Sequence, residues 1–167
     1  MKNLIAPHGS ATLKPLFIND SVKRESILEA SKDMPQLLLN SAAAANAVML
    51  GAGYFTPLSG FMDKNDAMSV ANNMVTSNGL FWPIPILNLT KDLGLIKQND
   101  EIALLDPNID GNPVIATQTV ESIDHLSDDE ILNIAKKTFG TIDNKHPGVS
   151  NFLNLGNILI SGPLKVL

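Results

Sequence analysis

Apolar residues in the first half of this chain recur mostly at helical intervals. The recurring side chains lie three or four positions apart, and each series follows an Asp or a Ser that can cap a helix. This pattern predicts helices at residues 20–32, 42–50 and 64–74. A short strand is predicted at 36–40, directly after Pro35.

The spacing also predicts which face of each helix is buried. In the first helix, opened by Asp20 or Ser21, we expect Val22, Ile27 and Leu28 to point inward.

In the other two helices, Ser41 and Asp63 are the expected caps, with Gly51 at the end of the second helix. The inward face of the third helix is expected to be Ala67, Val70, Ala71 and Met74. The flexible side chains expected to fill the core are Met49, Met62, Met68 and Met74.

The second half of the chain shows shorter apolar stretches separated by turn residues. Asn78-Gly79 signals a tight turn, and the run at 81–89 is expected to form an edge strand or a kinked one because Pro83 and Pro85 remove two donors. The other strands are predicted at 101–105, 114–123 and 157–160.

One further helix is marked by a capping box, in which Ser127 and Glu130 can satisfy each other's backbone amides. Helices and short strands thus alternate without the regular rhythm of a parallel sheet. This order predicts an α+β fold with a mostly antiparallel, barrel-like sheet. We expect residues 1–167 to form a single domain, although a division near residues 75–80 is conceivable.

The composition narrows the range of functions. The 167 residues are 44% hydrophobic and 17% charged, with a formal net charge of −5 and a single Arg, Arg24. Nucleic-acid binding usually needs a concentrated basic face, so this balance argues against it. The absence of Cys excludes disulfides and thiolate metal sites. No secretory signal or membrane span is expected, which makes the cytoplasm the default location.

The sequence matches the known motifs of catalytic, phosphate-binding and metal-binding sites only weakly. Gly51-x-Gly53 lacks the third Gly of a dinucleotide loop and follows a helix, so packing explains it better than phosphate binding. The three His residues have no metal-ligand spacing. Neither Ser59 nor Ser161 lies in Gly-x-Ser-x-Gly. We therefore assign no catalytic, substrate-binding or metal residue.

Two local clusters have a structural and a functional interpretation. Asp128, Asp129 and Glu130 fit a helix start better than a metal site. Asp143 and His146 either fix a turn or line a contact with a following domain.

Several separated blocks, in a consistent order, resemble ATP sulfurylase (sulfate adenylyltransferase). The most specific is Gly-Ala-Gly-Tyr-Phe-Thr-Pro-Leu-Ser-Gly-Phe-Met at 51–62. The other blocks are Pro-His-Gly at 7–9, Leu-Lys-Pro-Leu at 13–16, Asn-Gly-Leu-Phe-Trp-Pro-Ile-Pro-Ile at 78–86, Ile-Ala-Leu-Leu-Asp-Pro at 102–107, Phe-Gly-Thr-Ile-Asp-Asn-Lys-His-Pro-Gly-Val at 139–149 and Ser-Gly-Pro-Leu at 161–164. The resemblance covers essentially the whole chain.

The resemblance implies the N-terminal domain of that family, a PUA-like β-barrel with added helices. In the family, a second domain carries the reaction through Gln-x-Arg-Asn-Pro, His-x-x-His and Gly-Arg-Asp motifs, none of which occurs in this sequence. The complete enzyme converts ATP and sulfate to adenosine 5′-phosphosulfate and pyrophosphate with Mg²⁺. The implied partners are a catalytic domain, in the same chain or a separate one, and further copies in a homo-oligomer.

The charge of the chain agrees with a non-catalytic role. Adenylyl transfer must hold a triphosphate, a dianion and a divalent cation, which requires clustered cationic groups. One Arg and dispersed Lys residues do not supply them. We expect a scaffold domain whose contacts with the catalytic domain are made by Tyr54, Phe55, Phe61, Asp143, His146 and Pro147. The alternative is a free-standing PUA-like module that binds RNA or a small ligand.

Overall fold

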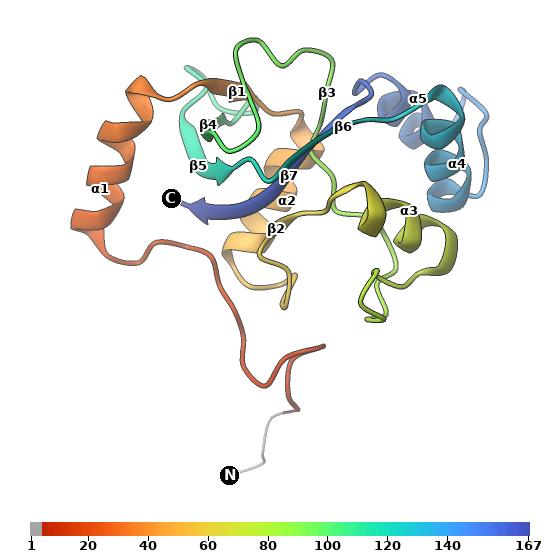
Figure 1. Cartoon of the computed structure of the whole chain (residues 1–167), viewed down its shortest axis with the longest axis horizontal. Helices are drawn as coiled ribbons and strands as arrows, with labels where there is room; N and C mark the ends of the chain where they lie inside the picture. The colour runs from red at the N-terminus through yellow and green to blue at the C-terminus, as the bar shows by residue number, and fades with distance from the viewer. Residues whose placement is uncertain (1–4) are drawn as a thin grey trace. The chain divides into compact units, whose positions relative to one another are not determined.

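The computed structural model describes residues 5–167, and the chain is of the predicted α+β class (Figure 1). Part of the stretch on which the expected absence of a secretory signal depends lies outside the described residues. Contacts within the chain define two compact units. The first unit comprises the chain up to Gly60 with Glu101–Thr119 and Pro163–Leu167, and the second comprises Phe61–Asp100 and Val120–Gly162. The expected single domain stays a prediction.

The first unit is built on a small mixed sheet with helices. Strand β1 pairs in parallel with β4, β4 pairs antiparallel with β5, and β5 pairs antiparallel with the end of β7. The register places Gln36 opposite Ala103 and Ala116 opposite Val166. The elements are α1 (Ser21–Ala30), the 3-10 helix η1 (Ser31–Asp33), β1 (Gln36–Leu38), α2 (Ser41–Gly51), β4 (Glu101–Leu105), β5 (Val114–Thr119) and part of β7 (Ile158–Val166).

The core of the first unit depends on the Ala-rich helix α2. Ala43, Ala44 and Ala47 are fully buried or nearly so, and α2 lies next to β5. Small side chains permit a close approach of the helix to the sheet, and β4 adds the buried Ile102 and Leu104.

The second unit contains the other strands and three of the helices. The first residues of β7 pair antiparallel with both β6 and β3, so this part of β7 is the centre of its sheet. The elements are α3 (Lys64–Asn73), β3 (Leu89–Thr90), β6 (Ser122–His125), α4 (Asp128–Phe139) and α5 (Pro147–Leu153), while β2 (Gly60–Phe61) has one residue in each unit.

One apolar cluster holds the helices of the second unit to its sheet. In Figure 1, α3, α4 and α5 lie together beside β6. Burial at helical spacing in α3 and α4 agrees with the sequence pattern. The buried members of the cluster are Ala67, Ala71, Leu89, Leu126, Ile131, Ile134 and Leu159.

Helix α4 begins with the predicted capping box, which also joins α4 to α3. The Glu130 amide donates to Ser127 Oγ at 3.3 Å, and the Ser127 amide donates to Glu130 Oε2 at 2.9 Å. Lys64 Nζ lies 2.8 Å and 2.9 Å from the two carboxylate oxygens. The Lys64 ammonium, together with the Ser127 amide, lowers the pKa of the Glu130 carboxyl.

Helix α1 starts at the predicted cap, but its predicted inward face is wrong. Asp20 Oδ1 accepts from the Lys23 amide at 2.9 Å. None of the ten helix residues is buried, and Val22 is 75% exposed. Val22 lies five residues before Ile27, and Leu28 follows Ile27 directly. The three side chains therefore point to different sides of a helix with 3.6 residues per turn.

Two details of the other helices also differ from the prediction. Asn40, not Ser41, caps α2, because its Oδ1 accepts from the Ala43 amide at 2.9 Å. Met74 ends α3 in the left-handed conformation and is 53% exposed, because the helix stops before that position. Met49 is also exposed rather than core, whereas Met62 is buried as predicted. The Asp63 cap of α3 is confirmed.

Three strand predictions need correction. The run at 81–89 is mostly irregular, because the two Pro residues interrupt it, and only its ends pair with other segments. The stretch 114–123 is two strands, since Val120 leaves the ladder and donates to Asp100 instead. The final strand β7 is longer than expected and continues to Val166.

No helix among residues 5–167 is both long and apolar enough to cross a membrane.

The lowered pKa of Glu130 gives a pH-dependent contribution to stability. Gln at this position keeps the capping geometry but removes the charge. We expect Glu130→Gln to lower the free energy of unfolding at pH 7 by less than about 1 kcal/mol, since the ion pair is partly exposed. The loss should shrink as the pH falls below the ordinary pKa of 4.5 and through the lower folded-state pKa, because protonation removes the charge from the parent as well.

Urea unfolding at several pH values measures this effect. Asp129→Asn, in the first turn of the same helix, serves as the control for loss of a helix-dipole charge. An equal loss for Glu130→Gln at pH 3 and pH 7 would contradict the assignment.

Candidate functional site

The loop that follows α2 is fixed to the N-terminal segment by two close approaches. A Cβ on Gly51 would lie 2.8 Å from Val166 Cγ1 and 2.9 Å from Phe17 Cζ, so a side chain has no space there. Gly53 has a φ of +80°, and a Cβ there would lie 3.2 Å from the Pro15 nitrogen. Both positions therefore favour Gly.

Thr56 completes the attachment of this loop. Its side chain is 4% exposed, and its Oγ1 donates to the Gly53 carbonyl at 2.7 Å. The same Oγ1 accepts from the Lys14 amide at 3.0 Å. One buried hydroxyl thus satisfies a carbonyl of its own loop and the amide of Lys14, which precedes Thr56 by 42 residues.

This fixed loop presents an aromatic ring to solvent. Tyr54 is 73% exposed, and its amide donates to the Met49 carbonyl at 3.0 Å, which ties it to the last turn of α2. Met49 and Val48 are also exposed, at 37% and 46%. Exposed aromatic rings on a rigid backbone are typical anchors of protein interfaces, because little entropy is lost when they bind.

The other two rings predicted at this contact are less accessible. Phe55 is half-buried, and Phe61 is 4% exposed. A buried ring offers no surface to a partner, so Phe61 serves the interior of the chain.

In the second unit, the structure brings Asp143, His146 and Pro147 together at the start of α5, and all three are exposed. The His146 amide donates to the Asp143 carbonyl at 2.9 Å. His146 Nδ1 accepts from the Val149 amide at 3.4 Å, so the imidazole is the N-cap of the helix. Its ring also lies 5.6 Å from that of Phe139. These bonds support the turn-fixing interpretation, and the contact with a following domain stays a prediction.

Helix α5 itself was missed from the sequence. It is only seven residues long and carries a Gly at its second position. One signal was available, because Pro is favoured at the first position of a helix and Pro147 stands there. An imidazole is an uncommon cap, and the His146 ring also contacts the ring of Phe139.

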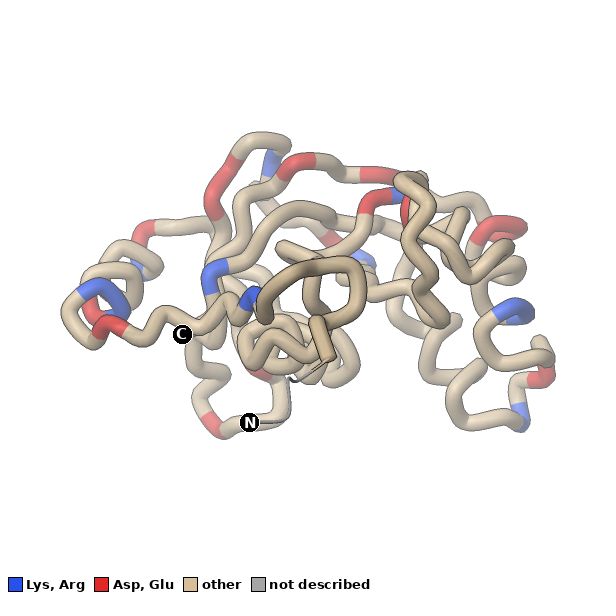
Figure 2. Tube along the Cα trace, turned by 90° about the horizontal axis from the view of Figure 1, so that it is seen from below, with Lys and Arg blue, Asp and Glu red and all other residues tan. Residues whose placement is uncertain are grey.

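The described residues show no gathering of cationic groups. Figure 2 shows Lys and Arg positions dispersed along the trace among Asp and Glu positions. Within residues 5–167, no group of three or more His, Cys, Asp or Glu could hold a metal ion. Arg24 lies on α1 and is exposed.

Residues 5–167 match the family model of the PUA-like domain. The chain belongs to the PUA-like domain family. A sulfate adenylyltransferase from Alcanivorax borkumensis is 48% identical to it over 167 residues, which is 100% of this chain and 42% of that protein. A sulfate adenylyltransferase from Allochromatium vinosum is 42% identical over 164 residues, 98% of this chain and 41% of that protein. The resemblance seen in the sequence is thereby confirmed.

Among solved structures, part of a hexameric APS kinase from Thiobacillus denitrificans has a similar fold. The TM-score is 0.67 at 24% identity, over 98% of this chain and 27% of that one. The mostly antiparallel, PUA-like fold predicted from the sequence is confirmed. The chain spans about two fifths of the length of the two sulfate adenylyltransferases it matches.

The attachment of the Tyr54 loop is open to a direct test. Thr56→Val keeps the shape of the side chain but leaves the Gly53 carbonyl and the Lys14 amide without this partner. We expect it to lower the free energy of unfolding by about 1–3 kcal/mol. Tyr54→Ala, two residues away, is expected to change it by about 0.5 kcal/mol or less, because the ring is exposed.

Urea unfolding of both variants and the parent measures the two effects. A larger loss for Tyr54→Ala than for Thr56→Val would show that the ring serves the stability of the chain itself.

Proposed function

We propose that this chain is the N-terminal scaffold domain of a sulfate adenylyltransferase and is not catalytic alone. The observation that carries the proposal is the match to sulfate adenylyltransferases, which covers the whole chain but only about two fifths of each relative. The dispersed charge of the described residues supports it, because adenylyl transfer needs clustered cations.

The proposed partner is the catalytic domain of such an enzyme, in the same chain or in a separate one. The complete enzyme would use Mg-ATP and sulfate to form adenosine 5′-phosphosulfate and pyrophosphate, in the cytoplasm and as a homo-oligomer. The present chain would supply packing surface and a defined orientation, and the catalytic domain would supply the cationic site.

The proposed contact surface in the first unit is centred on Tyr54. Its ring is the most exposed aromatic group of the segment 51–62, and the bonds of Thr56 hold the loop in one conformation. Phe55 adds a half-buried ring beside it. In the second unit, Asp143, His146 and Pro147 offer an exposed polar corner on a capped helix.

An activity assay tests the scaffold role. The purified chain is incubated with ATP, sulfate and Mg²⁺, and adenosine 5′-phosphosulfate is measured. We expect no turnover above the no-protein blank, whereas the complete Alcanivorax borkumensis enzyme is the positive control. Robust turnover by the chain alone would refute the proposal.

A chimera tests the contact surface. The matched segment of the Alcanivorax borkumensis enzyme is replaced by this chain, and the chimera is expected to be active. Tyr54→Ala in the chimera should lower its activity or its melting temperature, because interface anchors typically cost about 2 kcal/mol when truncated. Leu95→Ala is the matched control, since Leu95 is 86% exposed and lies outside the contact surface. Equal behaviour of the two variants would remove Tyr54 from the contact.

A further inference from the structure

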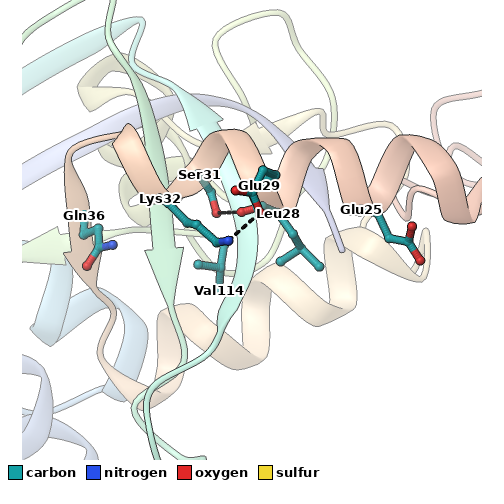
Figure 3. A pocket seen from close by; sticks show the side chains of 7 residues that line it. All are labelled: Glu25, Leu28, Glu29, Ser31, Lys32, Gln36 and Val114. Atoms are coloured by element: carbon teal, nitrogen blue, oxygen red, sulfur yellow. Dashed lines mark hydrogen bonds and ion pairs between the residues drawn. The ribbon is translucent and has the colours of Figure 1, made fainter.

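A groove of about 450 Å³ borders α1 and η1 in the first unit (Figure 3). Polar groups along it are bonded to near neighbours in the sequence. Lys32 Nζ pairs with Glu29, and the Ser31 hydroxyl donates to the Leu28 carbonyl at 2.7 Å. Such local pairs stabilise a helix end rather than prepare a site for a ligand. A reactive arrangement of polar groups lies instead in the second unit, directly after α3.

A short hairpin in the second unit contains Asn78-Gly79, the only Asn-Gly pair in the 167 residues. The Thr76 amide donates to the Leu80 carbonyl at 2.8 Å and closes a loop at 77–79, whose residues are exposed. Gly79 has a φ of +90°, as is common for the last residue of a hairpin loop of this length. The turn therefore favours the pair that stands there.

An Asn-Gly pair carries a reaction of its own. Once the Gly79 amide has lost its proton to hydroxide, its nitrogen can attack Asn78 Cγ, and the new C–N bond closes a five-membered succinimide. The Cγ–Nδ2 bond breaks, and the nitrogen leaves as ammonia after taking a proton from water. One water molecule then opens the ring and leaves aspartate or isoaspartate at position 78. The net change is the exchange of ammonia for water, without an oxidant or a cofactor.

The folded hairpin holds both reacting groups in other bonds. The Gly79 amide donates to the Thr76 carbonyl at 2.9 Å, so its proton is engaged and its direction is fixed. The Thr76 hydroxyl donates to Asn78 Oδ1 at 2.6 Å, which fixes the side-chain amide. One residue, Thr76, thus binds the attacking group through its carbonyl and the attacked group through its hydroxyl.

Thr76 is itself firmly placed. Its side chain is 4% exposed, and its Oγ1 accepts from the Leu80 amide at 3.1 Å. The Ser77 amide donates to Asp66 Oδ1 at 2.7 Å, which ties the loop to the first turn of α3. The succinimide therefore requires a local opening of the hairpin that breaks these bonds.

We propose that Asn78 is a self-modification site, which deamidates through a succinimide with Gly79 and is protected by Thr76 while the hairpin is closed. The rate follows the fraction of molecules in which the hairpin is open. This inference does not depend on the proposed enzymatic role, because all the groups involved lie within the second unit.

The isoaspartate product does not fit the closed hairpin. It adds a methylene to the main chain between positions 78 and 79, where the length of the loop sets the pairing of its arms. Val75 pairs with Phe81, and the Trp82 amide donates to the Met74 carbonyl at 2.8 Å. Either product also adds one negative charge to the formal net charge of −5. The modified chain is thus a more acidic form that ion exchange separates.

A comparison of the folded and the unfolded chain tests the protection. The purified chain is incubated at mildly alkaline pH, and peptide mapping by mass spectrometry measures the deamidated fraction at position 78. In concentrated urea the hairpin is absent, so the unfolded chain gives the intrinsic rate. We expect the folded chain to react at least about tenfold more slowly, because opening breaks several hydrogen bonds.

Substitutions at Thr76 test its part in the protection. Thr76→Val keeps the shape but removes the hydroxyl, so the folded variant should deamidate about fivefold faster than the parent, or more. Thr76→Ser keeps the hydroxyl and should stay within about twofold of the parent. Asp66→Ala releases the Ser77 amide and should accelerate the reaction about threefold, which tests the opening independently of Thr76.

Thr56→Val is the matched control for a general loss of stability. It is the same substitution at another buried Thr, in the first unit, and should leave the rate at position 78 within about twofold of the parent. In concentrated urea, the parent and all variants should react at one rate. Circular dichroism verifies that each variant is folded during the incubation without urea.

Any of three results would overturn the proposal. The first is an equal rate in the folded and the unfolded parent. The second is the absence of acceleration in both Thr76→Val and Asp66→Ala. The third is equal acceleration by Thr76→Val and Thr56→Val, which would show that unfolding of the whole chain, and not opening of the hairpin, controls the reaction.

Discussion

The first unit depends on the close meeting of three chain segments at Gly51. The Gly51 carbonyl accepts from the Leu16 and Phe17 amides at 3.0 Å and 3.1 Å. The Val166 amide donates to the Leu16 carbonyl at 3.0 Å, which adds the end of β7 to the same point. Because a Cβ would collide with Phe17 and Val166, the end of α2 can approach both segments only with Gly.

The exposed surface near Tyr54 follows from this constraint. The loop after Gly51 cannot move freely, since Thr56 ties it to the N-terminal segment and the Tyr54 amide ties it to α2. The ring is therefore held in solvent by a fixed backbone. Such pre-organisation lowers the entropic cost of docking, which makes the loop suited to contact with a second folded domain.

The distribution of charge agrees with the proposed supporting role. Lys64 is committed to Glu130, Lys165 to Glu101 and Lys32 to Glu29, so these cations stabilise local structure. The only Arg is exposed on α1. Under the proposed function, this domain would orient a catalytic partner through shape and apolar contact, and that partner would supply the cationic site for polyphosphate.

Features that depend on neighbouring residues were predictable from the amino-acid order alone. The Asp63 cap and the Ser127–Glu130 box were predictable, because the bonded groups are three residues apart. The family resemblance was also visible in the sequence, since its motifs are contiguous.

Features that depend on distant partners became visible only in the folded chain. The Lys64–Glu130 pair joins residues 66 positions apart, and the Thr56–Lys14 bond joins residues 42 positions apart. The exposure of Val22 and the burial of Phe61 also depend on segments that are distant in the sequence. An apolar residue has the same preference wherever it stands, but its burial depends on which segments fold against it, and local spacing does not contain that information.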